Sequence, residues 1–118
     1  MPLIQIDLDR EVHRQHGEAL SAAVHQAQVD VLDIPPGDRF QVFTPHDAGE
    51  LVFDPAYNDV DRRALVLVRI TMVHMYSVAT KRALFEAIAD RFEEAGLRRE
   101  DVLISVVENG FEDWFAGR

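Results

Sequence analysis

The feature that most constrains the fold is a pattern that occurs twice. An apolar segment is followed by an amphipathic segment and a second apolar segment, over residues 2–44 and again over residues 64–107. Apolar residues with a period of two indicate a strand, and a period near 3.6 indicates a helix. The chain is therefore predicted to contain two strand–helix–strand units, with equivalent points about 62 residues apart.

The first unit is predicted to comprise a strand over 2–8, a helix over 11–32 and a strand over 39–44. The first strand alternates and places four apolar residues on one face: Pro2, Ile4, Ile6 and Leu8. The helix has an apolar stripe at steps of four, three and four: Leu20, Val24, Ala27 and Val31. The sequence Pro35-Pro36-Gly37 favours a turn after this helix.

The second unit is predicted to comprise a strand over 64–73, a helix over 78–95 and a strand over 101–107. Ser77 is a suitable N-cap for the helix, and Gly96 suits its end. The strand over 64–73 is almost continuously apolar, which is typical of a strand buried on both faces. Residues 45–63 are predicted to form a hairpin loop, in which residues 50–53 could pair as a short arm.

These elements predict an α/β (α+β) fold in a single domain of residues 1–118. Parallel strands joined through a helix cross over with a right hand. Two such units give a four-stranded sheet, mainly parallel or mixed, with both helices on one face. Nothing left in the chain can cover the other face, so the sequence predicts an oligomer.

The charge and composition exclude several classes of function. A formal net charge of −9, without a basic cluster, argues against nucleic-acid binding. The chain has no cysteine, and its apolar runs are shorter than a membrane span requires. The beginning of the chain does not resemble a secretory leader, so a cytoplasmic protein is expected. His13 and His16 alone do not predict a metal site.

Pro2 is a candidate catalytic residue because it follows the initiator methionine. Removal of methionine would leave Pro2 with a free secondary amine. The apolar neighbours Ile4 and Ile6 would disfavour the charged form of this amine. A neutral amine can act as a general base or a nucleophile. Alternatively, Pro2 simply begins a strand, where its missing N–H costs little.

Several segments together resemble the tautomerase superfamily, and within it the malonate semialdehyde decarboxylase-like branch. The start, Pro-Leu-Ile-Gln-Ile-Asp-Leu, is similar to that of tautomerases with an amino-terminal catalytic proline. The segments that resemble the decarboxylase-like branch are Gly-Asp-Arg-Phe-Gln-Val at 37–42, His46, Gly-Glu-Leu-Val-Phe-Asp-Pro at 49–55 and Glu-Asp-Trp-Phe-Ala-Gly at 112–117. The resemblance covers essentially the whole chain.

The resemblance implies a tautomerase/MIF-like homotrimer with an apolar pocket near a subunit boundary. It implies a small carbonyl acid as substrate, with no cofactor and no metal. The reactions of the family are keto–enol tautomerisation, dehalogenation of haloacrylates and decarboxylation of malonate semialdehyde. Pro2 matches the catalytic proline, and Asp38 matches the aspartate that orients or activates water. As an alternative, Asp38 is a turn residue after Pro-Pro-Gly.

The sequence departs from the decarboxylase pattern before the second helix. Alignment on Ser77 and Lys81 places His74-Met75-Tyr76 where the decarboxylase has Arg-Pro-Arg. Histidine and phenol do not replace bidentate guanidinium–carboxylate contacts. Decarboxylation and haloacrylate hydrolysis are therefore disfavoured. His74 and Tyr76 are candidates for the pocket, as an adjustable cation and a hydrogen-bond donor, or else they are surface and packing residues.

Five further residues are candidates for substrate binding: Arg39, Arg69, His46, His25 and Trp114. Arg39 either faces a substrate carboxylate or forms a structural ion pair, which its strand position favours. Arg69 interrupts an apolar strand, so it needs an acidic partner or must reach a pocket. Each of the others has a structural alternative: a packed core histidine for His25, a loop residue for His46 and a tail anchor for Trp114.

The sequence thus predicts a cofactor-independent tautomerase that acts on a small 2-oxo acid or its enol, such as phenylpyruvate. Pro2 would move the proton, while Tyr76, His74 or Arg69 would stabilise the enolate oxygen. One alternative is a lyase or hydratase in which Asp38 activates water. Another is a non-catalytic trimeric binding protein with the same fold.

Overall fold

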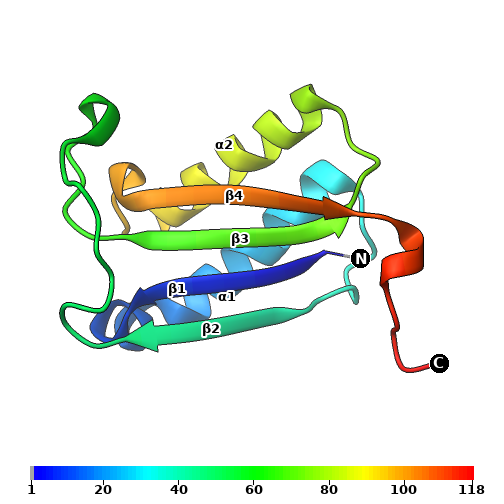
Figure 1. Cartoon of the computed structure of the whole chain (residues 1–118), viewed down its shortest axis with the longest axis horizontal. Coiled ribbons are helices and arrows are strands. Elements are labelled where there is room, and N and C mark those ends of the chain that lie inside the picture. Colours follow the sequence, from blue (N-terminus) through cyan, green and yellow to red (C-terminus); the bar gives the residue numbers. More distant parts are fainter. Residues whose placement is uncertain (1) are drawn as a thin grey trace.

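The computed structural model describes residues 2–118 and contains both predicted units (Figure 1). The first comprises β1 (Leu3–Asp9), α1 (Arg10–Leu32) and β2 (Gln41–His46), and the second comprises β3 (Val66–Val73), α2 (Val78–Glu94) and β4 (Val102–Asn109). Three short 3-10 turns lie at Tyr57–Asp59, Arg99–Asp101 and Phe111–Asp113. The tandem strand–helix–strand prediction is confirmed.

The four strands form one mixed sheet in the order β2-β1-β3-β4. The outer pairs β1–β2 and β3–β4 are parallel, whereas the central pair β1–β3 is antiparallel. This topology gathers the starts of β1 and β2 and the ends of β3 and β4 at one end of the sheet, here called the Pro2 end (Figure 1). The opposite end, where β2 finishes, is called the His46 end.

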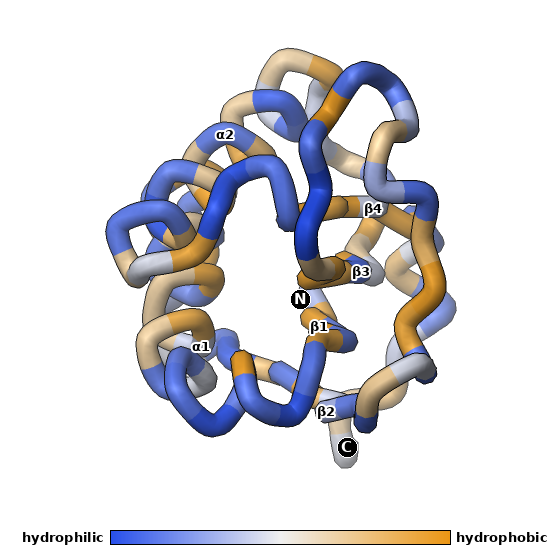
Figure 2. Tube along the Cα trace, turned by 90° about the vertical axis from the view of Figure 1, so that its left-hand side faces the viewer, coloured by the Kyte–Doolittle hydropathy of each residue, from blue (hydrophilic) through white to orange (hydrophobic). Residues whose placement is uncertain are grey.

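Both helices pack on one face of the sheet and against each other (Figure 2). The predicted alternation of β1 is confirmed, since Ile4, Ile6 and Leu8 are fully buried on this face. Ser77 caps α2 by accepting a hydrogen bond from the Thr80 N–H at 3.1 Å. Such a cap typically stabilises a helix by about 1 kcal/mol. Within residues 2–118, no helix is long and apolar enough to cross a membrane.

Residues 2–118 leave the other face of the sheet uncovered. Alternate residues of β3 point to this open face, so burial of residues 64–73 on both faces depends on the oligomer that the sequence predicts. Arg69 lies there, exposed between Gln5 of β1 and Ser105 of β4. The acidic partner expected for Arg69 is not found within residues 2–118, and in the single chain its side chain is exposed to water.

The segment between the units differs from the predicted hairpin loop. β2 extends through His46, and residues 50–53 form no strand within the described chain. Gly49 has φ +88°, a left-handed conformation that turns the chain away from β2 directly after it ends. The short apolar segment 51–53 pairs with no strand within residues 2–118.

Candidate active site

Pro2 lies at the point where three segments of the fold meet. It is buried, and it precedes β1 with the same alternation as Ile4, which faces the helices. The Ile4 N–H donates to the Phe40 carbonyl at 3.0 Å, which joins the start of β1 to the start of β2. On its other side, Leu3 is in register with Thr71 near the end of β3. The pairing of β1 thus places Pro2 between the approach to β2 and the end of β3.

Asp38 is carried to the Pro2 end by a tight turn that begins at Pro35. The Asp38 N–H donates to the Pro35 carbonyl at 2.9 Å, and His25 Nε2 lies 2.7 Å from the Pro36 carbonyl. His25 is buried in α1. It therefore behaves as the packed, hydrogen-bonded histidine that was the structural alternative, and it holds the turn that presents Asp38.

Tyr76 shares its surroundings with Asp38. The tyrosine follows β3 and packs its ring against the hydrophobic core. Burial, and to a smaller extent the Asp38 carboxylate, raises the pKa of the Tyr76 phenol above its ordinary value. The phenol consequently stays protonated at neutral pH, where it can donate a hydrogen bond to a carbonyl or enolate oxygen.

His74 contacts Glu108, an acid that also binds Lys81. Glu108 at the end of β4 accepts from His74 Nδ1 at 2.9 Å and from Lys81 Nζ at 2.7 Å. The hydrogen bond from Lys81 has the largest effect in lowering the pKa of the Glu108 carboxyl, and His74 adds to it. His74 itself is exposed, whereas Glu108 and Lys81 are mostly buried.

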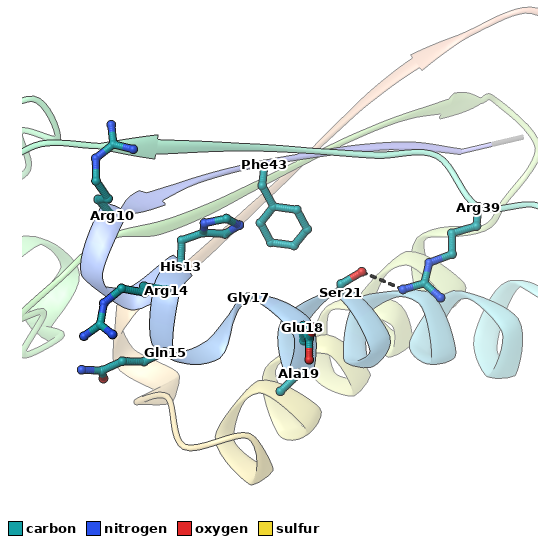
Figure 3. A pocket seen from close by; sticks show the side chains of 10 residues that line it. All are labelled: Arg10, His13, Arg14, Gln15, Gly17, Glu18, Ala19, Ser21, Arg39 and Phe43. Atoms are coloured by element: carbon teal, nitrogen blue, oxygen red, sulfur yellow. Dashed lines mark hydrogen bonds between the residues drawn. The ribbon is translucent and has the colours of Figure 1, made fainter.

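Arg39 points away from the Pro2 end. Its Nη2 donates to the Ser21 hydroxyl of α1 at 2.7 Å, and no carboxylate within residues 2–118 forms an ion pair with it (Figure 3). The expected structural ion pair is thus a hydrogen bond to a hydroxyl. Arg39, Ser21, His13 and Phe43 are among the residues that line an open groove of about 960 Å³ between α1 and β2. Pro2, Asp38 and Tyr76 do not line this groove.

The other candidates for substrate binding lie in three different places. His46 lies at the His46 end, where its Nε2 is 2.7 Å from Asp7 Oδ1, so within one chain it does not share a site with Pro2. Arg69 lies in the middle of β3 on the open face. The tail after β4 lies at the Pro2 end (Figure 1). Trp114 belongs to this tail, and its Nε1 donates to Asn109 Oδ1 at 2.8 Å, which anchors the tail.

Lys81 and Glu108 were not predicted as site residues, although the sequence carried a signal for one of them. The residues of β4 that face the helices alternate as Val102, Ile104 and Val106, and Glu108 is the next position in this row. A carboxylate on an otherwise apolar row requires a partner. Within residues 2–118, histidine and carboxylate side chains form no cluster of three or more that could hold a metal ion.

Comparison with known families and curated proteins finds tautomerases. A model of the tautomerase enzyme family matches residues 38–117. The chain is 34% identical to the probable tautomerase YusQ of Bacillus subtilis (strain 168), over 99% of this chain and 94% of the relative. It is 25% identical to the probable tautomerase YrdN of the same organism, over 99% of this chain and 92% of that protein.

Comparison with solved structures finds malonate semialdehyde decarboxylases. FG41 malonate semialdehyde decarboxylase inhibited by 3-bromopropiolate has a TM-score of 0.92 and 34% identity, over 98% of this chain and 89% of the other. A second malonate semialdehyde decarboxylase has a TM-score of 0.90 and 29% identity, over 98% and 91%. A symmetric trimer of fused 4-OT has a TM-score of 0.81 at 18% identity, over 98% and 91%, which shows the shared fold.

Proposed function

The chain belongs to the tautomerase family of enzymes, in the malonate semialdehyde decarboxylase-like branch, and from this premise we propose that it is a cofactor-independent tautomerase whose base is Pro2. The substrate class is a small 2-oxo acid and its enol. The observation that carries the proposal is that Tyr76, partly buried against the core, has its pKa raised by burial and by the Asp38 carboxylate, next to the end of the sheet where Pro2 lies. In this proposal Pro2, Asp38 and Tyr76, from three separate segments, supply the base, the carboxylate and the neutral donor.

The proposed reaction moves one proton and needs no other reactant. The neutral nitrogen of Pro2, freed by removal of methionine, accepts the hydroxyl proton of the enol. The electron pair of the O–H bond forms the carbonyl, and the carbon–carbon double bond takes the proton back from Pro2 at C3. Tyr76 donates a hydrogen bond to the oxygen while it carries negative charge. Stabilisation of such an oxyanion is usually the largest single contribution to catalysis.

The apolar surroundings of Pro2 support its role as base. Its neighbours on the same face, Ile4 and Ile6, are buried. Burial in apolar surroundings costs the charged form of an amine more free energy than the neutral form, because the charged form is more strongly hydrated. The neutral form of Pro2 is therefore favoured. A general base is most effective when its pKa is close to the working pH, and burial moves an amine in that direction.

A lyase reaction is the second candidate, favoured by the similarity to two malonate semialdehyde decarboxylases. In this reaction Asp38 would activate water or support the loss of carbon dioxide from a 3-oxo acid. Arg39 binds Ser21, and Arg69 lies on the opposite face of the sheet, so neither guanidinium replaces the two arginines of the decarboxylase pattern within one chain. We therefore place tautomerisation first.

The assembly is proposed to be a homotrimer. The open face exposes Val42, Leu103 and Val107, three apolar side chains that a monomer would leave in water. One of the solved structures with this fold is a symmetric trimer. Because Pro2 lies at an end of the sheet, contact between neighbouring subunits there would complete its pocket.

The test of the proposed function is phenylpyruvate tautomerisation by wild type and by Pro2→Ala, each verified by mass to lack methionine. Loss of the secondary amine is expected to reduce kcat/KM by about 10²–10⁴-fold, the usual contribution of a general base. Asp38→Asn assayed with malonate semialdehyde separates the two candidates. Unchanged tautomerisation by Pro2→Ala would exclude Pro2 as the base, and decarboxylation by wild type that Asp38→Asn abolishes would favour the lyase.

A further inference from the structure

We propose that the open groove between α1 and β2 is a second binding site, and that its ligand is an α-amino acid with an aromatic side chain. Arg39 binds the carboxylate of this ligand, and Glu18 binds its ammonium group. The rings of His13 and Phe43 contact its side chain. All four residues line the groove (Figure 3), whereas Pro2 does not, so the site is independent of the proposed reaction.

Arg39 determines where the carboxylate binds, because its guanidinium is held in place but is largely unused. Its Nη2 donates to the Ser21 hydroxyl at 2.7 Å. Ser21 in turn donates to Gln41 Oε1, and Gln41 Nε2 donates to the Ser21 carbonyl at 3.0 Å. No other hydrogen bond of the Arg39 side chain is found within residues 2–118. The remaining N–H donors of the planar guanidinium can therefore bind a carboxylate through two parallel hydrogen bonds.

The other arginines of the groove are already paired with carboxylates. Arg10 Nε lies 2.8 Å from Asp47 Oδ1, and Arg14 forms an ion pair with Glu11. These contacts neutralise the end of the groove where α1 begins. The anionic group of a ligand is therefore attracted most strongly to the opposite end, where Arg39 lies (Figure 3).

The second strand–helix–strand unit has a corresponding groove whose arginine is occupied. This groove lies between α2 and β4, has a volume of about 280 Å³ and is lined in part by Arg99. Arg39 and Arg99 each precede the second strand of their unit. Arg99 forms ion pairs with Asp90, at 2.6 Å, and with Glu86. Of these two grooves, the one of about 960 Å³ thus contains the arginine that is free to bind an anion.

Glu18 is the reason for preferring an amino acid to a simple carboxylic acid as ligand. It is exposed on α1 and forms no ion pair within the described part of the chain. It lies three residues before Ser21, and side chains at this spacing are neighbours on a helix. The charge of Glu18 repels a carboxylic acid but attracts an ammonium group. In an α-amino acid both charged groups are attached to one carbon, so one ligand can satisfy Glu18 and Arg39.

The aromatic part of the ligand is indicated by the rings of His13 and Phe43. Their centroids are 5.3 Å apart, and Phe43 packs against the core. Gly17 makes room for this arrangement, because a Cβ there would lie 2.9 Å from His13 Cδ2. A rise of about 1.5 Å per residue places Gly17 about 6 Å from Ser21 along α1. This spacing is close to the separation of the carboxylate and the ring in phenylalanine.

The position of the groove in the fold keeps it apart from the proposed subunit interface. The groove lies on the side of the sheet that carries α1. The exposed apolar side chains assigned to the interface, Val42, Leu103 and Val107, lie on the opposite face. Assembly through that face therefore requires none of the groove residues.

The first test is a titration followed in ¹H–¹⁵N spectra, with probes that share a phenyl ring and differ in charge. L-phenylalanine carries both charged groups, 3-phenylpropionate lacks the amine, and 2-phenylethylamine lacks the carboxylate. The amide signal of Gly17 reports the groove, so binding at the Pro2 end is not counted. L-phenylalanine should bind at least about tenfold more tightly than either analogue, because each analogue leaves one charged side chain unpaired. No binding of L-phenylalanine up to its solubility limit would overturn the proposal.

Two charge variants should change the affinities in opposite ways. Arg39→Gln should weaken binding of both L-phenylalanine and 3-phenylpropionate by about tenfold or more. Glu18→Gln should weaken L-phenylalanine to a similar extent but bind 3-phenylpropionate at least as well as wild type. Arg99→Gln, in the corresponding groove, is the matched control and should bind every probe as wild type does. Wild-type affinity for L-phenylalanine in Arg39→Gln or in Glu18→Gln would overturn the proposal.

A third pair of variants tests the ring contact and keeps both charges. Gly17→Ala brings a methyl group against the His13 ring and forces the ring to move. Alanine is a better helix former than glycine, so the melting temperature should not fall. His13→Ala removes the ring itself. Both variants should bind L-phenylalanine several-fold more weakly, and unchanged affinity in both would contradict the contact of the ligand with His13 and Phe43.

Discussion

Each end of the sheet has a histidine in contact with a carboxylate, and the two pairs differ in how far the histidine is exposed. At the His46 end, His46 and Asp7 are both mostly buried, with 21% and 24% of their side chains exposed, and Glu50 lies 3.9 Å from the other ring nitrogen. At the Pro2 end, the carboxylate of Glu108 is buried to a similar degree, but its histidine is exposed. The histidine–carboxylate pair at the His46 end is therefore mostly buried and contacts the following loop, whereas at the Pro2 end the imidazole ring of His74 is exposed to solvent.

The difference follows from what the topology brings to each end. At the Pro2 end, the antiparallel pairing of β1 and β3 gathers the first residues of the chain, the turn before β2 and the ends of β3 and β4. At the His46 end, β2 leads directly into the loop that begins at Asp47, and His46 contacts Glu50 four residues later. Distant segments meet at both ends, but at the His46 end the long-range contact of His46 with Asp7 is joined by a local loop that folds back through Glu50.

The largest effect on this comparison is expected from Tyr76→Phe. Removal of the hydroxyl takes away the donor to the enolate oxygen but keeps the ring that packs on the core. We expect kcat for phenylpyruvate to fall about 10²-fold, as when one donor to an oxyanion is lost. His46→Asn at the other end, the matched control, should leave kcat unchanged. Equal losses in both variants would show that the comparison is wrong.

The pH dependence of the rate sharpens the same prediction. Burial and the Asp38 carboxylate raise the pKa of the Tyr76 phenol, so the phenol keeps its proton to a higher pH than an ordinary tyrosine. In wild type, the decline of kcat caused by phenol ionisation should therefore lie above the ordinary tyrosine value of 10.0. Asp38→Asn should move this decline to lower pH. A shift to higher pH in a pH–rate profile would contradict the assigned contact.

A smaller effect is expected from His25→Leu. The variant removes the contact of Nε2 with the Pro36 carbonyl and should loosen the turn that carries Asp38, while the apolar side chain still fills its place in α1. We expect kcat/KM to fall about tenfold with little change in the mode of assembly, since misplacement of a site residue by about 1 Å is costly. Amide hydrogen exchange should rise at Asp38 and stay unchanged at His46. Undiminished activity would show that the turn needs no support from His25.

The smallest effect concerns stability in acid. The pKa of Glu108 is lowered by Lys81 first and then by His74. A lowered carboxyl pKa stabilises the fold above the unfolded value of 4.5, and this contribution is lost as the pH falls through the folded value. Wild type should therefore be more stable to urea than Glu108→Gln at pH 7, and the difference should shrink below pH 4.5. A constant difference across this range would show that the charge of Glu108 does not matter.

The sequence predicted those parts of the fold that local patterns determine. The alternation of Ile4, Ile6 and Leu8 gave the buried face of β1, and Ser77 gave the start of α2. The burial of β3 on both faces stays a prediction, because within residues 2–118 only the helices cover the sheet and the second layer would come from another subunit. The arm at residues 50–53 was wrong because pairing depends on a neighbouring strand, which this chain does not supply.

Site residues could be predicted where a motif or a position in the chain identified them. Residues that meet only through the pairing of strands could not be predicted. Pro2 and Asp38 were identified as candidates from short motifs, and the structure brings both to the Pro2 end. Glu108 lies 34 residues from His74 and 27 from Lys81 in sequence, so only the pairing of β3 with β4 and the packing of α2 show that they meet. Long-range contacts of this kind leave almost no trace in a local pattern.

The most direct test of the central claim is the intact mass of the purified protein, with phenylpyruvate tautomerisation measured on the same sample. We expect a mass that is lower by one methionine, together with turnover that follows the processed fraction. A chain that retains methionine has an amide at Pro2, which cannot accept a proton. Full turnover by such a chain would contradict the assignment of Pro2 as the base.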